Sequence, residues 1–226
     1  MHGKVIVITG CSGALGKVVA DAAIARGAKV AGIDRAAVTG GATADRIEFG
    51  GVDLTDPEQA LRAVDAAAAH FGRLDGLVNI AGAFAFETIA DGDPKTWQHL
   101  YAINVTTALN ASRAAIPHLV ASGAGRIVNI GATGALQAGA GTGAYAASKA
   151  AVHRLTEALA AELKGKVTVN AVLPSTIDTP ANRRDMPKAD FATWVTAHEL
   201  ANVILFLASD AASGVTGALL PVRGRV

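Results

Sequence analysis

The sequence of 226 residues has no large excess of either charge and only one cysteine. It contains 20 Lys and Arg against 19 Asp and Glu, so it lacks the basic surplus by which proteins hold nucleic acid or an anionic membrane. Cys11 cannot form a disulfide within the chain, which fits a reducing compartment. We therefore expect the partners to be a small-molecule substrate and further copies of the chain, with no nucleic acid and no membrane.

Long apolar runs are also missing, although 51% of the residues are hydrophobic. No run approaches the roughly 20 residues that a membrane-spanning helix needs. The opening MHGKVIVITG enters a strand-like run directly, without the basic segment, apolar stretch and cleavage site of a secretory signal. The six histidines show no ligand-like spacing with other donors. We expect a cytoplasmic protein without a metal site.

Short β-branched runs alternate with longer alanine-rich segments of helical periodicity, which is typical of a parallel sheet covered on both faces. The predicted strands are residues 4–9, 29–34, 46–52, 76–79, 125–130, 167–173 and 218–222. The predicted helices are residues 14–26, 57–71, 94–122, 145–163 and 198–209, with Gly27, Gly72 and Gly165 at helix ends. The length suits one domain. We predict an α/β fold with a single Rossmann-type, doubly wound parallel sheet of seven strands.

A glycine-rich turn follows the first predicted strand. The stretch TGCSGALG places Gly10, Gly13 and Gly16 before a helix, where glycines permit a close backbone approach to a pyrophosphate at the helix N-terminus. Taken alone, the pattern could be a plain strand-to-helix turn. Asp34 follows Gly16 by 18 residues, at the end of the second strand, where a carboxylate can accept hydrogen bonds from ribose hydroxyls. It favours NAD(H), while Arg35 could pair with a 2′-phosphate and keeps NADP(H) open.

Two further segments stand at the carboxyl ends of predicted strands, where ligands bind in open α/β sheets. Asp53, in GVDLTD, is placed to meet the adenine amino group, and NIAG, residues 79–82, could run past the adenosine. Either could be only a turn, since Asp53 could cap the helix that begins near Pro57 and Gly82 could merely end a strand.

Tyr145 and Lys149 are four residues apart on a predicted helix, so they share one helical face. An unperturbed tyrosine phenol has a pKa of about 10, and a nearby ammonium stabilises the phenolate. Such a tyrosine can give a proton to a carbonyl or imine as hydride arrives, or remove one in reverse. The alternative is a buried aromatic ring beside a surface lysine.

Together these motifs make the chain resemble the short-chain dehydrogenase/reductase family over almost its entire length. TGCSGALG matches the family's TGxxx[AG]xG motif with Ala14 at the second glycine position, and NIAG matches NNAG with Ile80 as the replacement. Tyr145 and Lys149 match YxxxK, with Lys149 also holding the nicotinamide ribose. Asn104, in INVTT, falls on the helix asparagine that holds a water in the family's proton relay.

The resemblance extends to LPSTIDTP, which matches the family segment that packs against nicotinamide, with Thr179 facing the carboxamide. Ser175 replaces the usual glycine after Pro174; a strand followed by a proline turn would explain Pro174 but not Thr179. The resemblance implies a homodimer or homotetramer built partly on the helices that bear Asn104 and Tyr145. The implied cofactor-binding residues are Gly10, Ser12, Gly13, Leu15, Gly16, Asp34, Arg35, Asp53, Leu54, Asn79, Ala81, Gly82, Tyr145, Lys149, Pro174, Ile177 and Thr179.

One position departs from the family at the chemistry itself. The catalytic serine falls on Ala132, 13 residues before Tyr145. Alanine cannot hydrogen-bond a substrate oxygen, and loss of such a donor costs roughly a hundredfold or more where the chemistry needs it. Thr133 is the nearest hydroxyl, but an adjacent residue often points elsewhere. Either the site is impaired or the substrate does not need this hydroxyl.

A second resemblance bears on that choice. Residues 171–194, AVLPSTIDTPANRRDMPKADFATW, are similar to the corresponding segment of dihydropteridine reductases, a branch that keeps Tyr and Lys but lacks the serine. The similarity implies a substrate lid over about residues 180–197. It also makes Asn182, Arg183, Met186 and Trp194, with Ala132 and Thr133, candidate substrate contacts, since apolar surface and polar edges suit a ring.

The sequence thus predicts a reductase or dehydrogenase that transfers hydride between NAD(H) and a small substrate. The favoured substrate is a quinonoid dihydropterin or a similar electron-poor conjugated ring. Two alternatives stay open: an NAD(P)H-dependent carbonyl reductase or alcohol dehydrogenase in which Thr133 or water replaces the serine, and a dinucleotide-sensing or scaffold protein without turnover.

Overall fold

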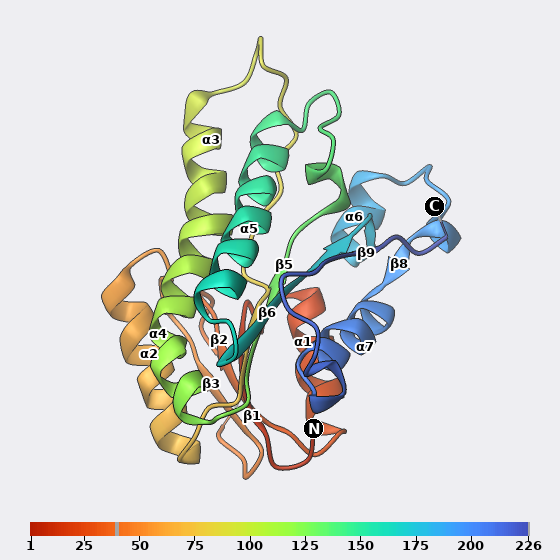
Figure 1. The fold of residues 1–226 in the computed structure, drawn as a ribbon. Helices are drawn as coiled ribbons and strands as arrows, with labels where there is room; N and C mark the ends of the chain where they lie inside the picture. The colour runs from red at the N-terminus through yellow and green to blue at the C-terminus, as the bar shows by residue number, and fades with distance from the viewer. Residues whose placement is uncertain (39–40, 226) are drawn as a thin grey trace.

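The computed structural model describes residues 1–38 and 41–225. Seven strands form one sheet in the order β3-β2-β1-β4-β5-β6-β9, and every neighbouring pair is parallel (Figure 1). The strands are β1 (Val5–Thr9), β2 (Lys29–Ile33), β3 (Arg46–Phe49), β4 (Gly76–Asn79), β5 (Gly125–Ile130), β6 (Val167–Pro174) and β9 (Leu219–Val222). The strand order reverses between β1 and β4, which opens a crevice at their carboxyl ends. The predicted seven-stranded, doubly wound sheet is confirmed.

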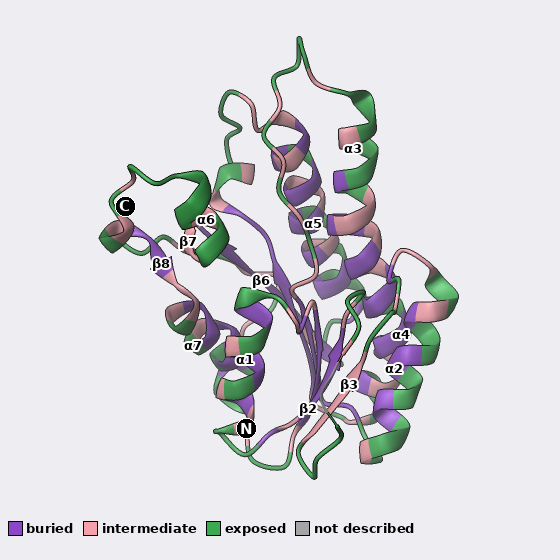
Figure 2. Ribbon diagram, turned by 180° about the vertical axis from the view of Figure 1, so that it is seen from behind, coloured by how far each residue is buried: buried purple, intermediate pink, exposed green. Residues whose placement is uncertain are grey.

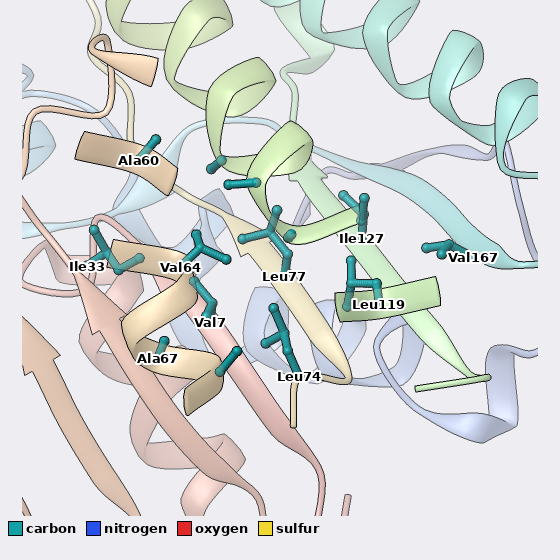
Figure 3. Close-up of a cluster of buried hydrophobic side chains, with 14 of the residues drawn as sticks. Val7, Ile33, Ala60, Val64, Ala67, Leu74, Leu77, Leu119, Ile127 and Val167 are labelled. Carbon is teal, nitrogen blue, oxygen red and sulfur yellow. The ribbon is translucent and has the colours of Figure 1, made fainter. Parts of the chain in front are cut away.

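Helices cover both faces of this sheet. They are α1 (Ala14–Ile24), α2 (Pro57–Phe71), α3 (Pro94–Tyr101), α4 (Thr107–Ala121), α5 (Gly143–Glu162), α6 (Pro180–Asp185) and α7 (Ala197–Leu207). Successive side chains of a strand point to opposite faces, so β1 contributes Val5 and Val7 to one core and Ile6 and Ile8 to the other. The first core packs against α2, α4 and α5 and the second against α1 and α7 (Figures 2 and 3).

Local signals in the sequence set several of the helix ends. Asp56 caps α2 by accepting hydrogen bonds from the backbone N–H groups of Glu58 and Gln59. Gly72 ends the same helix in the left-handed conformation, with φ of 77°. No helix among residues 1–38 and 41–225 is both long and apolar enough to cross a membrane.

The predicted helix over residues 94–122 differs in the structure, because a π-helical turn at Ala102–Thr106 separates α3 from α4. A π-helical turn has i→i+5 hydrogen bonds and occurs mostly as a single-turn bulge within an α-helix, frequently at functional sites. It carries Asn104, which is buried. A second difference lies between residues 177 and 196, where two short parallel strands, β7 (Ile177–Asp178) and β8 (Val195–Thr196), form a separate sheet. The segment predicted to be a substrate lid lies between and partly overlaps these two strands.

A row of buried polar side chains crosses the centre of the molecule. Asn79 of β4 donates to Asn129 of β5 over 2.8 Å and to Ser112 of α4 over 3.1 Å. Asn129 in turn donates to Thr156 of α5 over 2.9 Å. Asn79 and Asn129 are register partners in the parallel ladder. The row therefore links two central strands and two helices directly below the strand ends.

Candidate active site

A cleft of about 520 Å³ opens at the carboxyl ends of β1, β2 and β4. Its lining includes twelve of the predicted cofactor residues, namely Gly10, Ser12, Gly13, Leu15, Gly16, Asp34, Arg35, Asp53, Leu54, Ala81, Gly82 and Thr179. Asn79 lies beneath the cleft in the buried polar row. Pro174 ends β6, while Ile177 begins β7 and packs against the core of α1 and α7. Segments far apart in the sequence thus meet at one cleft.

The glycine-rich turn leaves room for a ligand to approach the backbone. Gly10 has φ of 68°, and a Cβ there would lie 2.9 Å from the backbone nitrogen of Ala81. A Cβ on Gly16 would overlap the carbonyl oxygen of Gly10. In the described part of the chain no side chain caps α1, and its first turn carries no acidic residue. The N–H groups of that helix end are therefore available to an anion, and the donor set fits the pyrophosphate of a dinucleotide.

Two carboxylates stand along the cleft beyond this turn. Asp34 accepts hydrogen bonds of 2.9 Å from the N–H groups of Ser12 and Ala36, which fixes it against the glycine turn. Asp53 accepts from both the hydroxyl and the N–H of Thr55, and these two bonds lower the pKa of Asp53. The residue that caps α2 is Asp56 and not Asp53. The hydrogen bonds that Asp53 accepts stabilise the turn between β3 and α2. The lowered pKa keeps the carboxylate of Asp53 ionised near the place where an adenosine would lie.

Tyr145 and Lys149 lie on one face of α5, and both are largely enclosed. Burial raises the pKa of Tyr145 to about 12. Burial lowers the pKa of Lys149 to about 8, and its Nζ donates to the carbonyl oxygen of Ile130 over 2.8 Å. Near pH 7 the phenol is therefore protonated and the lysine mostly charged. This combination suits a proton donor whose conjugate phenolate is stabilised by a neighbouring cation.

Asn104 joins this pair through its side chain. Its Oδ1 accepts from Ala83 N–H over 2.9 Å, and its Nδ2 donates to Ala83 O over 3.1 Å and to Ser148 Oγ over 2.9 Å. Ser148 Oγ donates in turn to the carbonyl oxygen of Tyr145. A Cβ on Gly82 would lie 2.5 Å from Asn104 Oδ1, so only glycine fits there. The asparagine thus clamps the segment after β4 to the helix that carries Tyr145.

That segment presents a residue that the sequence motifs did not single out. The ring of Phe84 meets the ring of Tyr145 edge-on, with centroids 4.9 Å apart. Phe84 is nevertheless 60% exposed, so much of its ring remains accessible. The contact of Phe84 with Tyr145 could be recognised only from the three-dimensional structure.

No hydroxyl at or next to position 132 takes the place of the missing serine. Ala132 is buried, and its N–H points to Nε2 of His153 at 3.4 Å. Burial lowers the pKa of His153, which keeps that nitrogen free to accept. Thr133 Oγ1 donates to the carbonyl oxygen of Pro174 over 3.2 Å, so its hydrogen is already committed. Neither residue offers the substrate a free hydroxyl hydrogen.

The four predicted lid residues take different positions. Arg183 forms two hydrogen bonds with Asp178 and lies over the ring of Phe191, 4.8 Å from its centroid. Asn182 donates to Ile177 O over 2.8 Å. Trp194 is only 6% exposed and packs against Phe191, whereas Met186 is exposed. Arg183, Asn182 and Trp194 are thus engaged within the lid, and Met186 keeps an accessible side chain.

Comparison with known proteins agrees with this geometry. Residues 4–190 match the family model described as "short chain dehydrogenase". The chain is 34% identical to 2-(S)-hydroxypropyl-CoM dehydrogenase 3 of Xanthobacter autotrophicus, over 99% of this chain and 96% of the relative.

Two solved structures extend the likeness to three dimensions. A short-chain type dehydrogenase/reductase from Mycobacterium ulcerans superposes with a TM-score of 0.91 at 29% identity, covering 100% of this chain and 90% of the other. Carveol dehydrogenase from Mycobacterium avium in complex with NAD gives a TM-score of 0.87 at 29% identity, over 99% and 97% of the two chains. The chain belongs to the short-chain dehydrogenase family, whose members are NAD(P)-dependent oxidoreductases.

Proposed function

We propose that the protein is an NAD(H)-dependent oxidoreductase in which Tyr145 is the acid and base. The observation that carries this proposal is the position of Lys149, whose Nζ would lie 3.4 Å from a Cβ built on Gly82 in the cleft lining. Tyr145 lies one helical turn from Lys149, and the glycine turn and uncapped helix end of the cleft fit a dinucleotide. Asn104 ties the two parts together through Ala83 and Ser148.

In the reductive direction the substrate takes up a hydride and a proton. NAD(H), when bound, would supply the hydride, and Tyr145 Oη would donate the proton to the substrate atom that becomes electron-rich. Lys149 would stabilise the phenolate that remains and hold the ribose, and a proton from solvent would restore the phenol. The side chain of Asn104 is fully engaged with Ala83 and Ser148, so we assign the support of a relay water to its backbone carbonyl.

The preference for NAD(H) rests on Asp34 in this proposal. Its carboxylate stands at the end of β2 on the cleft, where it would accept from ribose hydroxyls and repel a 2′-phosphate. The complex of carveol dehydrogenase with NAD supports the same choice. Titration with NADH and NADPH tests it, and tighter binding of NADPH would overturn the role of Asp34. Arg35→Gln serves as the control, because it should weaken only NADPH.

We propose further that the substrate is an electron-poor conjugated ring, such as a quinonoid dihydropterin. The site has no hydroxyl at Ala132 to hold a ketone oxygen, and Thr133 is bonded to Pro174 O. A ring that takes a proton on a conjugated nitrogen needs only Tyr145. The open side of Phe84 adds a flat apolar surface next to the phenol, of the kind that pairs with aromatic rings.

The second candidate is the oxidation of an alcohol or the reduction of a carbonyl group. The name of the Xanthobacter relative, a 2-(S)-hydroxypropyl-CoM dehydrogenase, favours it. On this alternative a water molecule would replace the serine hydroxyl. Ala132→Ser should then raise the rate on carbonyl substrates and leave the rate on a conjugated ring unchanged.

The test is to follow NADH oxidation with a quinonoid dihydropterin beside a panel of ketones, aldehydes and quinones. The proposal expects turnover of the conjugated ring, and Tyr145→Phe should abolish it while the affinity for NADH stays within about twofold. Activity on simple ketones with none on the pterin would reject the ring substrate. Binding of NADH without turnover of any compound would favour a dinucleotide-binding protein that is not an enzyme.

A further inference from the structure

Residues 223–225, which follow β9, lie across both ends of the lid, and we call them the strap. On one side Ser175 Oγ donates to Arg223 O over 2.7 Å, just after β6 ends. On the other side the N–H of Arg225 donates to Thr193 O over 2.9 Å, and its guanidinium forms an ion pair of 2.7 Å with Glu199 of α7. Figure 1 shows this last stretch reaching the lid beside β8. The strap therefore bridges the segment that enters the lid and the segment that leaves it.

Gly224, the middle residue of the strap, packs so closely against the lid that no side chain fits between them. Gly224 has φ of 70°, in the left-handed region that favours glycine. A Cβ at this position would lie 2.7 Å from Thr193 O and 2.9 Å from Val195 N. The strap and the end of the lid are thus in backbone-to-backbone contact, and any larger residue would push them apart.

The two ends of the lid are also joined to each other. β7 and β8 pair in parallel, with Asp178 beside Thr196, and Val195 N–H donates to Thr176 O over 3.1 Å. Glu199, which binds Arg225 through one oxygen, accepts from Thr196 N–H and Oγ1 through the other, each over 2.9 Å. The ion pair with the strap therefore acts on the same carboxylate that fixes β8.

From β7 the contacts continue to the lid helix and to the cleft. Asp178 binds Arg183 through two bonds, and Thr179 Oγ1 caps α6 by accepting from Asn182 N–H over 3.2 Å. Thr179 is also part of the cleft lining. A continuous series of contacts therefore connects the strap, through β8 and β7, to a residue in the lining of the cleft.

The strap also explains one departure noted in the sequence. Ser175 stands where a glycine is usual, and its hydroxyl is the donor that holds Arg223 O. Its N–H donates to Val222 O over 3.1 Å. Glycine would keep the second bond and lose the first. The serine therefore has a defined partner in this chain.

We propose that the strap is a latch for the lid, and that Arg225 is a positioning residue which holds Thr179 and α6 in the arrangement that binds the cofactor. The latch acts through Glu199 and the backbone of Thr193, and it touches neither substrate nor cofactor. The part of this inference that concerns cofactor affinity rests on the function proposed above. The part that concerns the lid does not.

Arg225→Gln removes the charge and keeps the backbone N–H, while Gly224→Ala forces the strap away from Thr193 and keeps the charge. Arg223→Gln is the matched control, because it removes an equal charge from the strap and leaves the carbonyl that Ser175 binds. Arg225→Lys tests rescue. The lid carries its own reporter, since trypsin can cleave after the exposed Arg184 and Lys188, and mass spectrometry separates these cuts from all others.

Loss of an exposed ion pair changes an equilibrium by up to about fivefold. We expect initial cleavage in the lid to rise about three- to fivefold in Arg225→Gln and further in Gly224→Ala. Arg225→Lys should return it towards the wild-type rate, and Arg223→Gln should match the wild type. The Kd for NADH should rise by the same factor as cleavage, because fewer molecules hold the binding arrangement, and kcat should change less than KM.

Wild-type cleavage in Arg225→Gln, or equal sensitivity of Arg223→Gln, would overturn the latch. Faster cleavage of the lid with unchanged NADH affinity would establish the latch and overturn its role in cofactor binding. If the wild type binds no NADH, the proposed function fails, and cleavage alone decides the latch. Thermal melting of each variant excludes global unfolding as the cause, and Arg225→Gln decides the question if Gly224→Ala does not fold.

Discussion

Lys149, the buried lysine of the candidate active site, should lower the stability of the protein in the absence of ligand, and Lys149→Met should reveal this. Lys149 lies within the fold, and burial lowers its pKa from 10.5 to about 8. At about 1.4 kcal/mol per pH unit, this difference corresponds to roughly 3 kcal/mol of cost for the charged form. Methionine has a similar length and carries no charge, so it avoids that cost.

The sign of the effect follows from the two protonation states. Below pH 8 the lysine is charged in both the folded and the unfolded chain, and the full cost is present. Between pH 8 and pH 10.5 the folded chain releases the proton while the unfolded chain keeps it, so the wild type gains stability as pH rises. Loss of the bond from Nζ to Ile130 O costs the variant about 1–2 kcal/mol at every pH. At pH 7 we therefore expect Lys149→Met to be more stable by about 1–2 kcal/mol.

Urea unfolding between pH 7 and pH 10, followed by tryptophan fluorescence, measures this difference. The advantage of the variant should shrink steadily with pH and reverse near the upper end of the range. Lys164→Met, at an exposed lysine beyond α5, is the control and should stay parallel to the wild type. Parallel curves for Lys149→Met and the wild type over the whole range would refute the buried, charged lysine.

Three further outcomes are expected. Gly16→Ala should abolish NADH binding, because the added Cβ overlaps Gly10 O at the glycine turn. Calorimetry measures the affinity, and retained micromolar binding would contradict the assignment of this turn to the pyrophosphate. Phe84→Leu should raise KM for a conjugated-ring substrate about two- to tenfold through loss of an aromatic contact, with Phe206→Leu on the exposed face of α7 as the matched control. Asn104→Ala should release the segment after β4 and reduce kcat by about tenfold or more with KM for NADH little changed; an equal loss in both would point to a disturbed cofactor cleft.

Much of the fold followed from the sequence because its signals are local and repeated. β-branched strands alternate with alanine-rich helices, and the predicted strand cores coincide with those of the structure. The cofactor cleft could be predicted for the same reason, since most of its segments follow a strand; Ile103 and Thr107, on the helical stretch after α3, are the exceptions. Gly10, Asp34 and Asp53 come together because parallel strands end on one side of a sheet.

Other parts of the site depend on contacts that no local pattern records. The edge contact of Phe84 with Tyr145 joins residues far apart in the chain, and the direction of the Thr133 hydroxyl is set by Pro174 O. Arg183 looked available for a substrate in the sequence, but Asp178 and Phe191 occupy its guanidinium. Side-chain partners of this kind are decided by tertiary packing, so they could not be read from spacing alone.

The row of amides between β4 and β5 has a consequence for the assembly of the sheet. Sliding β4 by one residue against β5 would place Asn79 beside an aliphatic residue instead of Asn129. In a parallel sheet covered on both faces, the strands are nearly continuous apolar runs, so the apolar pattern alone distinguishes neighbouring registers poorly. The two buried amides oppose such a slip, since each would lose a hydrogen-bond partner at a cost of about 1–3 kcal/mol in stability. The polar row therefore favours one register of β4 against β5. It thereby fixes the relative positions of the segments that follow these strands, residues 80–84 and 131–133.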